Sequence, residues 1–246
     1  MDEAASPRGA QAIIRALSVL RAFSAERTAL SVTEIAGIIG VSVPTAHRIA
    51  TTLESQHYLS RDPATKAFSL GPELLGLARL VADSQDSGID PQSLAAIRDA
   101  TGETCSVHVR VGDRRVCVAE EVSRQPHRVT SGVGQSYPLN AGAAGKIILS
   151  LLRDDEVERL IALTSDADTR PLPGRQIIAA IREARERGYA ISQGETVPGA
   201  IAVAVAVPWN GSGPPSAVNL VGPRDRMTAQ AIERGLDEIR SVLKPP

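Results

Sequence analysis

Three short segments near the N-terminus carry apolar residues at helical spacing. The apolar positions are Ile13, Ile14, Leu17, Leu20 and Phe23 in the first segment, Val32, Ile35, Ala36 and Ile39 in the second, and Ala46, Ile49, Ala50 and Leu53 in the third. Because residues three and four apart share one face of a helix, each segment predicts a helix with a single apolar stripe. We expect the stripe of the first helix to pack behind the third helix.

The second and third predicted helices have clear boundaries. Ser31 and Glu34 have the spacing of a capping box, in which the two side chains bind free amides at a helix start. Gly40 stands where a helix end favours a residue with positive φ. Ser42 can cap the third helix, and Pro44 is tolerated in a first turn that has no amide bond to lose. The two helices are therefore predicted to form a helix-turn-helix.

The third helix presents a polar outer face. At about 100° per residue, the positions opposite or beside its apolar stripe are Pro44, Thr45, His47, Arg48, Thr51, Thr52 and Ser55. This face is nearly free of acidic residues, so it can donate to phosphates and base edges in a DNA major groove. The candidate DNA-binding residues in this segment are Ser42, Thr45, His47, Arg48 and Thr52. An ordinary solvated helical hairpin would show the same pattern.

A hairpin with a basic tip is predicted directly after the third helix. Residues 58–61 and 67–70 alternate between apolar and polar side chains, and residues 62–66, DPATK, separate them. A hairpin at this place is the wing of a winged helix. Arg61 and Lys66 would then flank the DNA backbone, and Lys66 joins the candidate DNA-binding residues.

The rest of the chain mixes strands and helices after a linker. A linker helix is predicted within residues 72–88. Strands are predicted over residues 105–111, 115–119, 127–133, 189–192, 201–207 and 217–221, and helices over residues 94–100, 140–149, 154–163, 174–187 and 228–243. Gly112-Asp113 is a strong hairpin turn, and Asn140 is a good N-cap. This order predicts an α+β domain with an antiparallel sheet.

Several motifs together resemble the IclR family of transcriptional regulators. They are Leu30–Ala36, Val43–Arg48, Leu53-Glu54, Phe68–Pro72, Tyr137–Lys146, Arg185–Ala190, Glu195–Gly199 and Gly222–Thr228. The resemblance implies an α+β chain of two domains. The N-terminal winged helix-turn-helix DNA-binding domain would cover residues 10–71, and a linker helix residues 72–88. A GAF-like antiparallel-sheet domain for effector binding and oligomerisation would cover residues 89–246.

The resemblance also implies a ligand-responsive transcription regulator, with repression as the more common mode. Its partners would be a double-stranded, pseudo-palindromic DNA operator, a small-molecule effector, and further copies of the chain in a homodimer or homotetramer. Similarity places the effector pocket among Gly132, Leu139, Ala143, Ala144, Glu195, Ala202 and Asn219. Many members have cysteine and serine where this chain has Ala202 and Asn219. The expected effector is a small carboxylic acid, aromatic acid or amino acid.

Positive charge is concentrated where the DNA-binding motif lies. The 246 residues are 43% apolar and 22% charged, with a formal net charge of −1. Within residues 8–71 the basic side chains are Arg8, Arg15, Arg21, Arg27, Arg48, Arg61 and Lys66, and the acidic ones are Glu26, Glu34, Glu54 and Asp62. Contact with nucleic acid should therefore be local. The N-terminus is polar, and no apolar run approaches the roughly 18 residues of a membrane span, so a cytoplasmic protein without a membrane partner is expected.

No cofactor, metal site or catalytic group is predicted. The segment Gly142–Lys146 departs from the phosphate-loop pattern, because Asn140 and Ile147 replace the required glycine and hydroxyl. The four histidines and two cysteines lack metal-ligand spacing, and no G-x-S-x-G elbow is present. Small residues at 142–146 allow either close approach of a ligand to a helix start or plain helix-on-sheet packing.

The two cysteines are expected to be small core residues rather than a disulfide or a redox sensor. A hairpin centred on residues 112–113 would place Cys105 opposite about Glu120 and Cys117 opposite about His108, so the two sulfurs are not direct cross-strand partners.

Two other functions stay open at this point. The C-terminal domain could convert its metabolite, which would make the chain an enzyme with an N-terminal helical interaction module. The missing nucleophile, base and metal sets argue against this alternative. The winged helix could also bind a protein instead of DNA.

Overall fold

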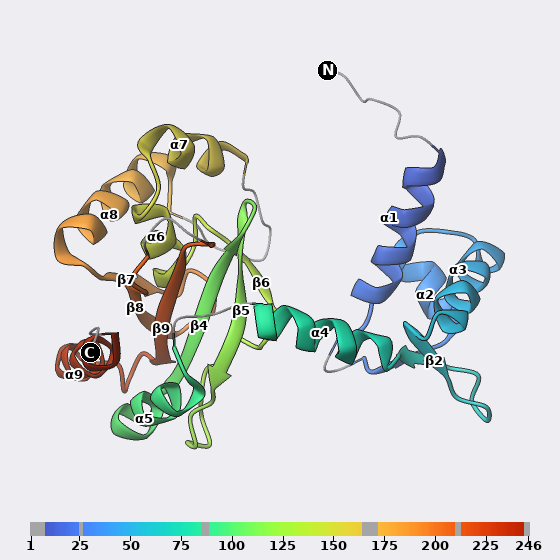
Figure 1. The fold of residues 1–246 in the computed structure, drawn as a ribbon, viewed down its shortest axis with the longest axis horizontal. Helices are drawn as coiled ribbons and strands as arrows, with labels where there is room; N and C mark the ends of the chain where they lie inside the picture. Colours follow the sequence, from blue (N-terminus) through green and yellow to red (C-terminus); the bar gives the residue numbers. More distant parts are fainter. Residues whose placement is uncertain (1–7, 25–26, 85–88, 164–171, 210–212, 244–246) are drawn as a thin grey trace. The chain divides into compact units, whose positions relative to one another are not determined.

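The chain divides into two compact units, residues 1–84 and 85–246, which are described separately (Figure 1). The structure is a computed structural model, and it describes residues 8–24, 27–84, 89–163, 172–209 and 213–243. The two-domain α+β class expected from the sequence is confirmed.

The N-terminal unit is a winged helix. Its elements are α1 (Arg8–Arg21), β1 (Ala29–Leu30), α2 (Val32–Ile39), α3 (Val43–Ser55), β2 (Leu59–Arg61), β3 (Phe68–Leu70) and α4 (Glu73–Ser84). The three strands form an antiparallel sheet in the order β1-β3-β2. The core contains Val19, Ile35, Ala46, Ala50 and Phe68, each at most 4% exposed. The predicted capping box is present, because the Ser31 side chain accepts from Glu34 N while the Glu34 carboxylate accepts from Ser31 N.

The apolar stripe predicted for α1 is only partly buried, which corrects the expectation that all of it packs behind α3. Leu20 and Phe23 pack against the core, and Val19 is fully buried. Leu17, one turn before Leu20, is 48% exposed, and Ile13, two turns before it, is 63% exposed. The early turns of α1 therefore extend beyond the core of their own unit.

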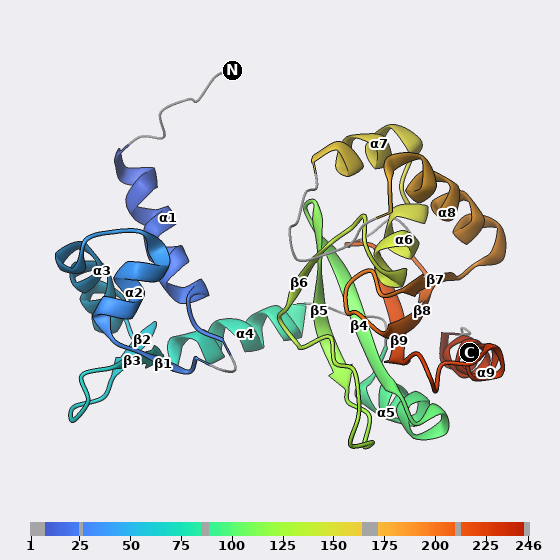
Figure 2. The ribbon, with the colours of Figure 1, turned by 180° about the vertical axis from the view of Figure 1, so that it is seen from behind.

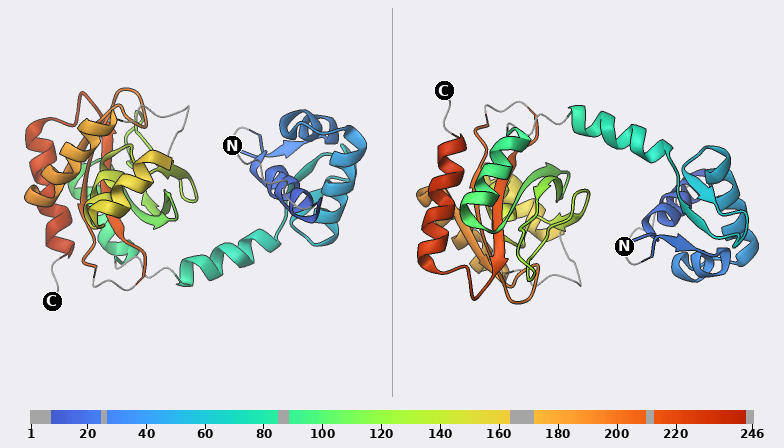
Figure 3. Two further views of the ribbon diagram at one scale, coloured as in Figure 1. Left: turned by 90° about the horizontal axis from the view of Figure 1, so that it is seen from above. Right: turned by 90° about the horizontal axis from the view of Figure 1, so that it is seen from below.

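The C-terminal unit is a six-stranded antiparallel sheet with helices on both faces (Figures 2 and 3). Its elements are α5 (Pro91–Thr101), β4 (Thr104–Val111), β5 (Arg114–Glu121), β6 (Ser136–Pro138), α6 (Ala143–Ser150), α7 (Asp154–Leu163), α8 (Gly174–Arg187), β7 (Ala190–Gln193), β8 (Ala200–Ala206), β9 (Ser216–Pro223) and α9 (Ala229–Leu243). The strand order is β6-β5-β4-β9-β8-β7.

Alternation along the strands divides the core of this unit into two layers. Ala202 and Ala204 of β8 face the layer formed by α6, α7 and α8, whereas Val203 and Val205 face the layer formed by α5 and α9. Two of the predicted effector residues, Ala202 and Asn219, are on the sheet, and both face the layer formed by α6, α7 and α8. The site therefore lies on the α6 side of the sheet.

Two local predictions in the C-terminal unit are wrong. Residues 127–133 are not a strand, because Ser131 N and Gly132 N donate to the Glu120 carboxylate and Gly132 has a φ of +77°. The strand between β5 and α6 is β6, which pairs with β5 on the side opposite β4. The helix expected from Asn140 begins at Ala143, because the φ of Gly142, +83°, is incompatible with a helix.

The cysteine register is correct for one residue and shifted for the other. Cys117 pairs with His108 as predicted. Cys105 pairs with Glu121 rather than Glu120, because an irregularity between Val107 and His108 shifts the register by one residue.

Candidate DNA interface and effector pocket

The outer face of α3 is exposed, and its hydroxyl groups already have partners within the helix. Ser42 and Thr45 share a hydrogen bond of 2.9 Å between their hydroxyl oxygens, and Thr52 Oγ1 donates to Arg48 O at 2.8 Å. Thr45 is half-buried, whereas Ser42, His47, Arg48 and Thr52 are exposed. The predicted residues therefore share one surface, but their side chains are not equally free to change partners.

Arg48 is the arginine among the predicted residues of this surface. It is exposed, and it makes no ion pair with any of the residues that the structure describes. Its guanidinium is thus available for two parallel hydrogen bonds to guanine O6 and N7 or to a phosphate. Val43 in the first turn of α3 was not among the expected contacts, yet it is 42% exposed although apolar. Such a side chain can contact a thymine methyl group.

The wing is a tight turn, and Phe68 at the start of the strand that follows it is buried. Asp62 accepts from Ala64 N at 2.8 Å and from Thr65 N at 2.7 Å, and the Thr65 bond is the main cause of a lowered Asp62 pKa. Lys66 has a φ of +62° and is exposed at the tip. The Arg61 guanidinium lies 5.3 Å from the centre of the buried Phe68 ring. Lys66 is therefore the wing cation that points most freely to solvent.

A pocket lies between the N-terminus of α6 and the centre of the six-stranded sheet. Its lining residues are Arg115, Val129, Thr130, Ser131, Tyr137, Gly142, Ala143, Ser192, Thr196, Val197, Ala202, Asn219 and Val221. The enclosed cavity is small, about 20 Å³, and the wider space of about 330 Å³ includes the open part at its mouth. Aliphatic side chains and hydroxyl groups dominate its surface.

The structure brings three of the seven predicted effector residues into this pocket, namely Ala143, Ala202 and Asn219. Gly132 follows the lining residue Ser131 and does not line the pocket itself. Leu139 and Ala144 are each 1% exposed and belong to the apolar core around α6. The seventh residue, Glu195, does not line the pocket, because its carboxylate binds other groups of the protein.

Glu195 is held by two groups at the start of α6. Its Oε1 lies 2.5 Å from Lys146 Nζ, and its Oε2 accepts from Gly142 N at 2.9 Å. Lys146 Nζ also donates to Ile191 O at 2.9 Å. Both side chains are at least nine-tenths buried. Through these bonds Lys146 connects α6 with β7 and with the segment after it, although neither side chain of the pair lines the pocket.

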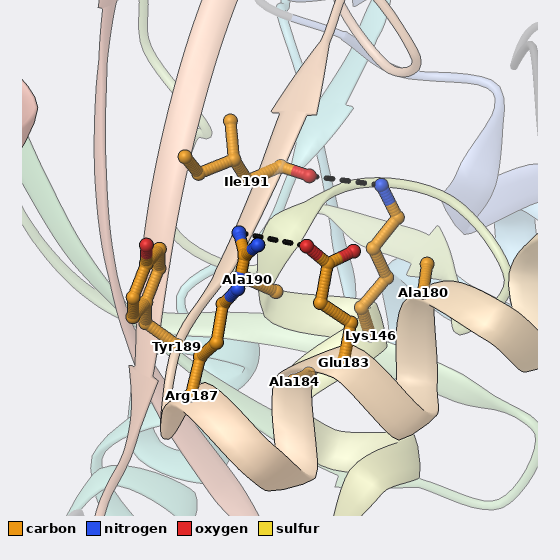
Figure 4. A pocket seen from close by; sticks show the side chains of 8 residues that line it. All are labelled: Lys146, Ala180, Glu183, Ala184, Arg187, Tyr189, Ala190 and Ile191. Atoms are coloured by element: carbon orange, nitrogen blue, oxygen red, sulfur yellow. Dashed lines mark hydrogen bonds and ion pairs between the residues drawn. The ribbon is translucent and has the colours of Figure 1, made fainter. Parts of the chain in front are cut away.

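A second pocket lies on the other side of Lys146, between α8 and β7 (Figure 4). Ala180, Ala184 and Ala190 contribute to its wall. At its rim Arg187 binds Glu183 at 2.7 Å, and both side chains are more than half exposed. The charged groups in this pocket are therefore already paired.

Arg115 lines the pocket although it was not among the residues expected there. The residue is 4% exposed, its Nη1 donates to His108 Nδ1 at 2.8 Å, and its guanidinium carbon lies 4.6 Å from the centre of the Tyr137 ring. Its Nε has no hydrogen-bond partner. Burial lowers the pKa of Arg115 to about 10, so the side chain stays charged at neutral pH.

His108 connects Arg115 to buried hydroxyl groups. Because His108 Nδ1 accepts from Arg115, the proton of the neutral ring lies on Nε2, which donates to Ser106 Oγ at 3.2 Å. Ser106 Oγ lies 3.4 Å from Ser131 Oγ on the pocket wall. Burial, followed by the charge of Arg115, holds the pKa of His108 well below its ordinary value.

Comparison with known proteins identifies the family. Residues 12–63 match the IclR helix-turn-helix domain, and residues 90–244 match the domain described as bacterial transcriptional regulator IclR C-terminal. The chain belongs to the IclR family. Its N-terminal unit is thus a DNA-binding unit of a transcriptional regulator, and the resemblance seen in the sequence is confirmed.

Individual IclR-family proteins align with nearly the whole chain. The transcriptional regulator XynR of Escherichia coli K12 is 28% identical over 204 residues, which are 81% of each protein. The transcriptional repressor AllR of Salmonella paratyphi A is 24% identical and covers 92% of this chain and 85% of its own. The IclR regulator of Alicyclobacillus acidocaldarius has a TM-score of 0.80 at 26% identity, over 95% of this chain and 96% of its own.

One IclR homologue of known structure contains a ligand. The protein from Microbacterium hydrocarbonoxydans is complexed with 4-hydroxybenzoate, has a TM-score of 0.73 at 17% identity, and covers 94% of this chain and 97% of its own. The IclR-family match makes this chain a ligand-responsive transcription regulator and not an enzyme. The enzyme alternative therefore finds no support.

Other features of this IclR-family chain bear on metals, cysteines and membranes. Among the described residues no group of three or more His, Cys, Asp and Glu side chains could hold a metal ion. Both cysteines are free and buried, and burial raises the pKa of each thiol to about 12. In the part of the chain that the structure describes, no helix has the length and apolar character to cross a bilayer.

We expect the free energy of unfolding to fall as pH is lowered below 6.5. The folded chain keeps His108 neutral, whereas the unfolded chain binds a proton there below its ordinary pKa, so the unfolded state gains protons. At pH 5 the loss is at most about 2 kcal/mol, the limit that linkage sets when the folded state binds no proton at His108. Urea unfolding at pH 7.5 and 5.0, followed by the fluorescence of the single tryptophan Trp209, measures it.

His108→Gln should remove most of this pH dependence. His57→Gln is the control, because His57 is exposed in the other unit. An unchanged pH dependence in His108→Gln would contradict the assignment.

Proposed function

We propose that this chain represses transcription in the cytoplasm, binding a two-part DNA operator as a homodimer or homotetramer and changing its affinity when a small molecule occupies the α6 pocket. The exposed polar face of α3, with the Arg48 guanidinium on it, carries the proposal. The proposed DNA contacts are Ser42, Thr45, His47, Arg48 and Thr52 on α3 and Lys66 on the wing. The proposed units are residues 10–71 for DNA and 89–246 for the effector, joined by the linker at 72–88.

The proposed effector is a small carboxylic, aromatic or amino acid. The pocket beside Ala143, Ala202 and Asn219 supports this proposal, because it combines an apolar wall with polar groups. The ligand-bound homologue supports it by analogy alone. Gly132, Leu139, Ala144 and Glu195 would then act from behind the lining residues, on the loops and the helix that shape the pocket.

Binding of purified protein to the DNA upstream of its own reading frame tests the function. We expect a specific complex that pooled metabolites weaken or strengthen, with competitor DNA and stated salt in every measurement. Binding no tighter than to random DNA would count for the protein-binding alternative.

Exposed apolar residues on α1 support self-association. Ile13, Ile14 and Leu17 are 63%, 50% and 48% exposed and follow one another at helical spacing. On α4, Leu77 and Leu80 are 41% and 65% exposed and lie one turn apart. Such contiguous apolar stripes commonly mark association surfaces.

We expect sedimentation to give at least twice the chain mass of 25.9 kDa. Leu17→Lys should shift the equilibrium toward smaller species, because it places a charge within the α1 stripe. Gln11→Lys is the matched control, since it adds the same charge beside the stripe on the same helix. A wild-type monomer at micromolar concentration would contradict the dimer.

A further inference from the structure

Arg115 is a buried cation without a counter-ion. Among the described residues no carboxylate lies within ion-pair distance of its guanidinium, and Nε has no hydrogen-bond partner. Its one hydrogen-bond acceptor, His108, is a neutral ring. A charge buried in this way is costly unless an anion compensates it. The arrangement therefore indicates that an anion completes the site.

The surroundings of Arg115 allow its guanidinium to reach the pocket. A Cβ atom at Gly142 would lie 2.7 Å from Arg115 Nη2, so the glycine is needed for the guanidinium to reach the pocket. The aliphatic residues Ala143 and Ala202 form the apolar side. The guanidinium thus meets the pocket at a buried position with an apolar side, where a charge-assisted hydrogen bond is strong.

The other polar groups of the pocket are neutral. Ser192, Thr196 and Asn219 line it and form no side-chain hydrogen bonds with other described residues. The nearest further cation, Lys146, is committed to Glu195 and Ile191 O. The pocket therefore offers one positive charge and several hydrogen-bonding groups.

We infer that Arg115 anchors the carboxylate of a small, non-aromatic acid that carries one negative charge and at least one further oxygen. The inference rests on the proposed role of this pocket as the effector site. Ser192, Thr196 and Asn219 bind the additional hydroxyl or carbonyl oxygen. A second carboxylate would be buried without a cation, and this excludes dianions.

The fixed walls of the pocket limit the size of the acid. Ala202 and Asn219 lie on β8 and β9, which are paired along seven residues in the centre of the sheet. These strands cannot separate without loss of their hydrogen bonds. The lining residues outside helices and strands are 129–131, Gly142 and 196–197, and a ligand would enter by displacing this part of the lining. An aromatic ring would require a larger displacement than a chain of a few carbon atoms.

Titration calorimetry with the full-length protein tests the inference. Lactate is the small hydroxy acid, lactamide its neutral analogue, succinate the dianion and benzoate the aromatic acid. We expect lactate to bind at least tenfold more tightly than each of the other three, because only lactate satisfies the charge and size of the site. This comparison needs no variant, so it stands even if substitutions at Arg115 unfold the protein.

Variants identify the anchor. Arg115→Gln should abolish lactate binding, Arg115→Lys should retain part of it, and Arg114→Gln on the same strand should bind as the wild type does. Lactate binding unchanged in folded Arg115→Gln would overturn the anchor. Benzoate or succinate binding more tightly than lactate would overturn the ligand class, as would a wild type that binds none of the acids.

Binding to DNA separates failure of the inference from failure of the proposed function. A wild type that binds none of the acids, yet responds to pooled metabolites on its operator, overturns the ligand class and leaves the regulator intact. Acid binding that depends on Arg115 but has no effect on operator binding overturns the effector role and supports the anion site.

Discussion

Lys146→Met should lower the free energy of unfolding of the C-terminal unit by about 3–5 kcal/mol, the usual cost of removing one partner of a buried ion pair. The substitution keeps a side chain of similar length but leaves the Glu195 carboxylate buried with only Gly142 N as a partner. It also frees Ile191 O on β7. Urea unfolding followed by Trp209 fluorescence measures the change, because Trp209 lies in this unit and is the single tryptophan.

An exposed pair provides the control for Lys146→Met. Arg187 and Glu183 form an ion pair with side chains more than half exposed, so Arg187→Met should cost well under about 1 kcal/mol. The double variant Lys146→Met/Glu195→Leu should be more stable than Lys146→Met alone, since no unpaired charge remains. Equal losses for Lys146→Met and Arg187→Met would contradict the view that burial of the pair decides its strength.

Arg48→Ala weakens specific operator binding by about 1–3 kcal/mol, the usual cost of one cation that contacts a base. Arg48 is exposed on the face of α3 opposite the buried Ala46 and Ala50, so its loss should leave the fold intact. Electrophoretic mobility shift or fluorescence anisotropy at several salt concentrations measures the effect. Binding to random DNA should change much less than binding to the operator.

Two variants distinguish a base contact from a general loss of charge. Lys66→Ala on the wing should weaken binding to all sequences and reduce the salt dependence by about one counter-ion. Arg153→Ala, in the other unit, removes an 81% exposed side chain and should have no effect. Operator binding by Arg48→Ala that equals the wild type would exclude α3 as the reading helix, or Arg48 as its main contact.

The winged helix could be predicted almost completely, because its elements depend on contacts between close neighbours. Ser31 and Glu34 cap α2 from three residues apart, and Gly40 ends it with a φ of +68°. Such patterns involve residues that lie within one or two helical turns of one another. The exposure of Ile13 and Leu17 was not predictable. An apolar stripe on a helix does not show whether the residues that pack against it come from the same unit or from another copy of the chain.

The polar groups of the pocket could be predicted less well. Both phases of β5 contain apolar residues, Cys117 in one and Val116 and Val118 in the other, so alternation did not indicate that Arg115 faces inward. The predicted strand at 127–133 failed for a related reason. Glu120 accepts from backbone amides eleven and twelve residues away, and no local pattern reports such a bond.

Sequence alone established the helix-turn-helix, the wing, the antiparallel α+β domain and the family, because each depends on periodicity, caps or motifs within short segments. Only the tertiary structure brought Arg115 into hydrogen-bond contact with His108, which is 7 residues away along the chain, and Lys146 into contact with Glu195, which is 49 residues away. Strand register and helix packing decide those partners. A buried charge depends on what surrounds it in space, and neighbours along the chain do not specify that environment.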